Sequence, residues 1–298
     1  FGNAIAYVNA AISAGLDVDK FAPRISFFFV AQSNLFEEIA KFRAARRIWA
    51  KIIKTRFKSR DGRAAMLRFH TQTAGVTLTA QQPDNNIIRT TIQALAAILG
   101  GTQSLHVNSK DEALALPTEE SAQLSLRTQQ ILAHETGIIA TADPVGGSYY
   151  IEELTSRIEN KVNKYIDQID QLGGAVAALE EGFQVKEIQD SAFKHQKAIE
   201  NESSIVVGVN KYKSSTPPIE KIQLIDQKQT VCQIEKIKKL KQQRDNQVVR
   251  KSLSGLKAIA KTEQNIMPAI LDCAKAYCTL GEISDSMRLV FGEYDNAE

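Results

Sequence analysis

The sequence predicts an α/β protein that contains the C-terminal part of a TIM (β/α) barrel followed by a small helical tail. In the first half, short apolar runs of strand character alternate with longer segments of helical period, and polar residues follow each run. After Thr136 long helical patterns dominate and strand signals become few. We therefore expect an incomplete barrel at residues 1–213 and a helical region at 214–298, with a doubly wound sheet as the alternative fold.

The first predicted β/α unit follows an Ala-rich helical pattern at 4–12. Its strand, at 25–31, begins just after Pro23 and is rich in Phe and Val, which favour extended backbone. Polar residues at 32–34 can cap the next helix, predicted at 35–57, where apolar side chains recur at helical spacing.

Two further units complete the predicted partial barrel. A strand at 64–69 with a polar exit at 70–73 precedes a helix at 87–99, which Gly100 and Gly101 close. A short strand at 104–107 then precedes a helix at 119–136 with two glutamates in its first turn. Because polar residues follow each strand, a ligand site is expected at the C-terminal ends of the strands.

The tail is separated from the barrel by residues that break regular structure. A last strand-like piece at 205–209 is followed by a cluster of serines and prolines that disfavours helix and strand. This cluster places the boundary near Lys213. Beyond it we expect three helices, around 234–240, at 248–260 and at 269–280. The cluster consists of Ser214, Ser215, Pro217 and Pro218.

Composition excludes several function classes. The chain has 298 residues with 43% apolar and 24% charged side chains, and its formal net charge of +3 is too small to favour nucleic acid or an anionic membrane as a partner. No apolar stretch approaches the roughly 20 residues that span a bilayer. Three cysteines without a CxxC pair indicate a reducing compartment, so a cytoplasmic location is expected. The start at Phe1 indicates a piece of a longer protein, and its first residues do not resemble a secretory signal.

Common catalytic motifs are missing from the sequence. It has no HExxH or paired CxxC, and its four histidines are widely spaced, which disfavours a local zinc site and leaves open only one assembled from distant residues. GxSxG, GxxxxGK[ST] and GxGxxG patterns are also missing, so hydrolase, kinase-like and dinucleotide-binding functions have no anchor.

One polar cluster, FHTQTAG at 69–75, lies where barrel enzymes place catalytic groups. Together with further motifs in the same order it resembles the methylmalonyl-CoA mutase family, and this resemblance covers essentially the whole chain. The other motifs are GTQSLH at 101–106, DEALALPT at 111–118, DP at 143–144 with GSY at 147–149, GVNKY at 208–212, and the segment 283–292.

The resemblance implies a radical carbon-skeleton rearrangement of an acyl-CoA with adenosylcobalamin, in which methylmalonyl-CoA and succinyl-CoA are interconverted. His70 corresponds to the residue that contacts the thioester carbonyl, and a proton donor there is typically worth about 10²–10⁴ in rate. The remaining implied contacts are Arg60, Gln72, Ser109, Lys110 and Asp111 for the acyl-CoA, and His106 and Glu135 for the cofactor.

Two departures bear on substrate and partners. Where many methylmalonyl-CoA mutases have Ser-Gly-Trp, this chain has Ala74-Gly75-Val76, a form associated with enzymes whose cobalamin domain is a separate chain, including isobutyryl-CoA mutase. Isobutyryl-CoA/butyryl-CoA is therefore the alternative substrate pair. No DxHxxG motif offers an axial histidine, so we expect a separate small cobalamin-binding subunit and an inactive isolated fragment.

Two alternatives from other classes remain at this stage. A basic helix at 233–251 could bind nucleic acid, although it has no aromatic residues for base stacking and carries an apolar stripe instead. A non-catalytic scaffold that keeps the barrel but turns over no substrate is the other.

Overall fold

The computed structural model describes residues 1–214 and 222–293. The chain divides into two compact units, Phe1–Leu224 and Ile225–Glu298. The predicted boundary near Lys213 lies just before this division, and the breaker residues Ser215, Pro217 and Pro218 fall outside the described residues. The domain limits 1–213 and 214–298 stay a prediction.

A three-stranded parallel sheet lies within the first unit. Its strands are β1 (Phe27–Ala31), β2 (Phe69–Thr73) and β3 (Ser104–His106), in the spatial order β1-β2-β3. Each crossover contains a helix, as parallel pairing requires. The predicted mixed α/β architecture with a parallel sheet is therefore confirmed for this part of the chain.

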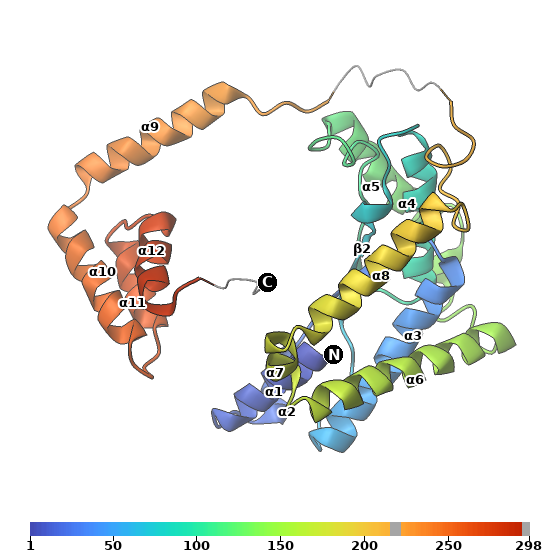
Figure 1. Ribbon diagram of the computed structural model, residues 1–298, viewed down its shortest axis with the longest axis horizontal. Coiled ribbons are helices and arrows are strands. Elements are labelled where there is room, and N and C mark those ends of the chain that lie inside the picture. Colours follow the sequence, from blue (N-terminus) through green and yellow to red (C-terminus); the bar gives the residue numbers. More distant parts are fainter. Residues whose placement is uncertain (215–221, 294–298) are drawn as a thin grey trace. The chain divides into compact units, whose positions relative to one another are not determined.

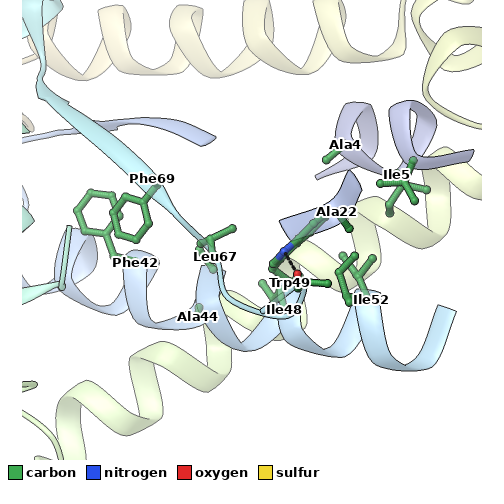
Figure 2. Packing of buried hydrophobic residues seen from close by; sticks show 14 of the residues in the cluster. Ala4, Ile5, Ala22, Phe42, Ala44, Ile48, Trp49, Ile52, Leu67 and Phe69 are labelled. Carbon is green, nitrogen blue, oxygen red and sulfur yellow. Dashed lines mark hydrogen bonds between the residues drawn. The ribbon is translucent and has the colours of Figure 1, made fainter. Parts of the chain in front are cut away.

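Helix α3 (Leu35–Lys51) packs on the sheet through aromatic rings. Asn34 caps it by accepting from the Glu37 amide, and a π-helical turn, η2 (Ile52–Arg56), continues it to near the predicted end. The ring of Phe42 stacks on Phe69 of β2 with centroids 5.3 Å apart, and Figure 2 shows the two rings against each other. Trp49 donates from Nε1 to the Ala64 carbonyl at 3.0 Å, which fixes the loop before β2.

Further helices surround this core. In Figure 1, α6 (Tyr149–Gln171) lies beside α3, and Arg43 of α3 forms ion pairs with Glu152 of α6 and with Asp143 in the loop before it. The elements of this unit not yet described are α1 (Gly2–Ser13), α2 (Val18–Phe21), η1 (Ala22–Arg24), η3 (Gly75–Thr77), α4 (Asn85–Leu99), α5 (Glu119–His134), η4 (Ile138–Ala140), α7 (Ala175–Glu180) and α8 (Phe183–Glu200).

Two strand predictions in this unit are wrong. The strand expected at 64–69 is β2 at Phe69–Thr73, so the residues taken as its polar exit form the strand itself. The residues before β2, at 62–65, form a turn, and its buried Ala64 packs into the hydrophobic core. The piece at 205–209 forms no strand either, because Val207 makes only an isolated bridge to Lys211 across a tight turn.

The second unit is helical, with α9 (Gln227–Gln243), α10 (Asn246–Ala260), α11 (Met267–Lys275) and α12 (Leu280–Phe291). The helix predicted at 269–280 is present but ends earlier than expected, since α11 ends at Lys275 and Thr279 starts α12 with a capping box. The basic helix predicted at 233–251 is divided in the same way, because Asp245 caps α10 at Gln247 and Val248. No helix among the described residues is both long and apolar enough to cross a membrane.

Candidate functional site

The sheet of the first unit has two different faces. Along β2 the side chains alternate, so that Phe69, Thr71 and Thr73 are buried toward the helices while His70 and Gln72 are only half-buried. The neighbouring strands are in register with this alternation, since Phe28 and Ser104 both pair with His70. We call the second side the open face; it is formed by Phe28, Val30, His70, Gln72, Ser104 and His106.

His70 lies at the centre of the open face, between the two neighbouring strands. Its Nδ1 is 2.7 Å from the Ser104 hydroxyl on β3, and the ring of Phe28 on β1 lies 5.1 Å from the imidazole, centroid to centroid. These two contacts orient the ring. When the Ser104 hydroxyl donates to Nδ1, Nε2 carries the ring proton and can donate to a ligand.

Gln72 shares the open face and is positioned by Asn108, a buried residue that follows β3. The Gln72 amide donates to Asn108 Oδ1 at 2.8 Å, and Asn108 in turn binds the Thr73 hydroxyl and carbonyl at 2.9 and 3.0 Å. This network ties the end of β2 to the loop after β3. It leaves the Gln72 amide oxygen available to accept from a ligand.

The loop Ser109–Asp111 presents only one of its three predicted contact residues to solvent. Ser109 and Asp111 are each 3% exposed, and Asp111 Oδ2 accepts from both the Thr118 amide and hydroxyl at 3.0 Å. Asp111 Oδ1 is buried and has no hydrogen-bond partner among the described residues. Lys110 is more accessible and forms an ion pair with Asp84 at 2.6 Å.

Arg60 lies at the other end of β2, in the loop that leads into the strand. Asp19 holds this loop: its carboxylate accepts from the Ser59 hydroxyl and from the Arg60 amide. The Ser59 hydrogen bond lowers the pKa of Asp19 below its usual value. The Arg60 guanidinium is exposed, and because a five-residue strand rises about 16 Å, Arg60 and Lys110 do not meet at one point.

The two predicted cofactor residues lie on different elements. His106 is exposed on the open face, paired with Gln72 across the sheet. Glu135 is the C-cap of α5, and the 16 residues of that helix, about 24 Å of length, separate it from the loop that carries Lys110. In residues 1–214 and 222–293 no group of three or more His, Cys, Asp or Glu side chains is placed to hold a metal ion.

Three residues of the site were missed in the sequence analysis. Phe28 is 60% exposed although it stands in the run FFFVA, and the alternation of side chains along a strand could have separated it from Phe27 and Phe29. Ser104 could have been identified if β3 had been aligned with β2 in the register that pairs Ser104 with His70. Asn108 carried no signal, because its role depends on a contact with β2 that is distant in sequence.

The chain is similar to a family of known proteins over nearly its whole length. A family model described as methylmalonyl-CoA mutase matches residues 1–293. The large subunit of 2-hydroxyisobutanoyl-CoA mutase from Aquincola tertiaricarbonis is 42% identical over 294 residues, which are 98% of this chain and 52% of that protein.

Methylmalonyl-CoA mutases show the same level of similarity. The Rhizobium meliloti protein is 43% identical over 290 residues, 97% of this chain and 41% of the relative. The mitochondrial protein of Homo sapiens is also 43% identical over 290 residues, with 97% of this chain and 39% of the relative covered. The chain therefore spans about half, or less, of the length of these relatives.

Proposed function

The chain belongs to the methylmalonyl-CoA mutase family, and from this membership we propose that it is part of an adenosylcobalamin-dependent isomerase that interconverts methylmalonyl-CoA and succinyl-CoA. The observation that carries the proposal is the open sheet face. On this face a half-buried histidine and glutamine and an exposed aromatic ring lie side by side on adjacent strands. We further propose that the three strands are a section of a TIM barrel whose interior is this face.

In the proposed mechanism, His70 Nε2 donates to the thioester oxygen of the acyl-CoA. Ser104 holds the imidazole in the required tautomer through Nδ1, and Phe28 restricts its rotation. Negative charge that develops on the oxygen during migration of the thioester group is stabilised by this donor, an effect typically worth about 10²–10⁴ in rate. Gln72 accepts from an amide N–H of the ligand through its free carbonyl oxygen.

The positions of Arg60 and Lys110 support a long, polyanionic ligand. They lie at opposite ends of the sheet, so a ligand that reaches both must extend along the strands, as the pantetheine arm of CoA can. The exposed guanidinium of Arg60 offers a charge-assisted hydrogen bond to a phosphate. Lys110 would have to exchange Asp84 for the ligand. Ser109 and Asp111 act by shaping the loop, through their buried hydrogen bonds.

The residues present fit a radical cofactor at the open face. Adenosylcobalamin, when bound, supplies the radical that starts the rearrangement. The six residues that form this face include no thiol, and thiols donate hydrogen atoms to carbon radicals. His106 on the same face is the residue we propose toward the cofactor. Glu135, at the far end of α5, stays a weaker candidate.

The acyl group is the second part of the proposal. One relative acts, by its name, on 2-hydroxyisobutanoyl-CoA and others on methylmalonyl-CoA, and the Ala74-Gly75-Val76 segment favours a branched acyl group without a carboxylate as the alternative. That the former relative is a large subunit supports a separate cobalamin-binding small subunit as partner.

The experiment that tests the proposal uses the full-length protein with adenosylcobalamin and the candidate small subunit. Methylmalonyl-CoA, isobutyryl-CoA and 2-hydroxyisobutanoyl-CoA are supplied separately, and the isomerised product is measured by mass spectrometry. We expect turnover of methylmalonyl-CoA above the other two. Preference for isobutyryl-CoA or 2-hydroxyisobutanoyl-CoA would change the proposed substrate but keep the reaction class. No isomerisation of any of the three would refute the function.

A further inference from the structure

The corner between α11 and α12 ends in a hydrogen-bond pattern that brings two cysteines together. The Cys278 amide donates to the Cys273 carbonyl at 2.9 Å, and the Tyr277 amide donates to the Ala274 carbonyl at 3.0 Å. Tyr277 has a left-handed backbone with φ of 60°. These are the two bonds and the left-handed residue of a Schellman motif, in which the side chains at the positions of Cys273 and Cys278 normally touch.

The two thiols are in contact and differ in accessibility. The side chains of Cys273 and Cys278 belong to one hydrophobic cluster, and burial, with the nearby Cys278 sulfur, raises the pKa of Cys273 to about 11. Cys273 is fully buried with Leu256, Ala269 and Ile283, whereas Cys278 is only partly covered. The backbone hydrogen bond holds the two residues close, as a disulfide with its Cα atoms about 4.4–6.8 Å apart requires.

We propose that Cys273 and Cys278 form a redox modification site, which low-molecular-weight disulfides convert into an internal disulfide bond. The Cys278 thiolate attacks one sulfur of the reagent disulfide, whose S–S bond breaks and releases one thiolate. Cys273 then loses its proton and attacks the Cys278 sulfur, and the second thiolate leaves. In total two protein thiols lose two protons and two electrons, and the reagent is reduced to two thiols.

Cys232 supplies an internal reference for this chemistry. It is exposed on α9, and among the described residues no backbone hydrogen bond outside the helices ties it to another cysteine as Cys278 is tied to Cys273. It should therefore react with the same reagent but stop at the mixed disulfide. The comparison separates general accessibility of thiols from the specific pairing at the α11–α12 corner, and it does not depend on the proposed isomerase function.

The test exposes the reduced full-length protein to oxidised glutathione, blocks remaining thiols by alkylation and maps the peptides by mass spectrometry. We expect the wild type to carry the Cys273–Cys278 link and a glutathione on Cys232. In a Cys273→Ser variant, Cys278 should keep its glutathione, because the resolving thiol has been removed.

The proposal is contradicted by a wild-type protein in which Cys278 retains glutathione while Cys273 stays reduced, and by one in which both remain reduced after Cys232 has reacted. Both are read on the wild type, so a folding defect in the variant would not affect the decision. A link between Cys232 and either corner cysteine would also overturn it.

Discussion

The two faces of the three-stranded sheet are made by alternate residues of the same strands, yet they differ in almost every property. The covered face carries Phe69, Thr71 and Thr73, which are at most 2% exposed, and every hydroxyl on it has a partner. The open face carries His70 and Gln72 on the same strand, together with the largely exposed Phe28. One strand therefore serves packing on one side and presents chemistry on the other.

This difference indicates where substitutions should affect stability and where they should affect function. Burial of apolar area and satisfied hydrogen bonds stabilise the covered side. On the open face little is buried within this unit, so polar groups there contribute little to folding, and their positions across the register of three strands fit a role in ligand binding. Separate measurements of activity and unfolding can test the division.

The largest expected effect is on activity, at His70. A His70→Ala substitution should lower turnover of the preferred acyl-CoA by about 10²–10⁴, because it removes the donor to the thioester oxygen. The free energy of unfolding should change little. Steady-state kinetics of the reconstituted protein and a denaturant titration measure the two quantities.

His134→Ala is the matched control, since this histidine is exposed at the end of α5. It should leave turnover within about twofold of the wild type, as surface substitutions away from a site generally do. If His70→Ala unfolds the protein or keeps full turnover, the open face is not a catalytic surface and the division between the faces fails.

The covered face is tested by removing the ring of Phe69. This side chain packs on Phe42 and Phe29, with centroids 5.3 Å away in both cases. Phe69→Ala should reduce the free energy of unfolding by about 3–5 kcal/mol through lost burial and the cavity that remains. Phe28→Ala, on the open face, is the control and should cost far less. Equal losses in a urea titration would show that both faces are buried in the intact protein.

Much of this fold follows from local sequence. The cap at Asn34, the glutamates in the first turn of α5, the aromatic run before Ala31 and the Gly100–Gly101 end of α4 mark element boundaries that the structure reproduces closely. The position of β2 did not follow, because HTQT is polar and looks like a loop. It becomes a strand through its pairing with β1 and β3, which is a tertiary effect that outweighs local propensity.

The site was predictable only in part for the same reason. His70 and Gln72 stand out in the sequence as one cluster, and the structure places both on the open face. Their neighbours Phe28 and Ser104 come from other strands, and only the register joins them. The error in β2 mattered here, since a strand that ended at Phe69 would have put His70 in a loop without defined neighbours.

Buried hydrogen bonds near the covered face should contribute less to the free energy of unfolding than the aromatic core does, but more than charges at the surface do. Gln93 of α4 is fully buried; its amide nitrogen donates to Thr77 at 2.7 Å and to Ser33 at 3.2 Å. Gln93→Leu leaves these hydroxyl oxygens without that donor and should cost about 1–3 kcal/mol of unfolding free energy. Gln72→Leu is the matched change on the open face. It should cost less in a thermal or urea melt, and the opposite order would contradict the division.

The smallest expected effect is a pH dependence confined to the helix side. Arg43, with the Gly147 amide, lowers the pKa of Glu152 from 4.5 to about 2, whereas the six residues of the open face include no carboxylate. A carboxyl group with a depressed pKa in the folded state stabilises the protein fully above its unfolded pKa, and this contribution is lost as the pH falls from about 4.5 toward 2. Glu152 is well exposed, so solvent and salt weaken the pair.

The test compares the melting temperature at about pH 5 with that at about pH 3. The decrease between the two should be slightly larger for the wild type than for Glu152→Gln, since the variant has already lost the charge. An identical fall in both proteins would mean that the α3–α6 contact does not depend on this ion pair, and that the other contacts between the two helices, such as the ion pairs of Glu159 with Arg47 and Lys51, are sufficient.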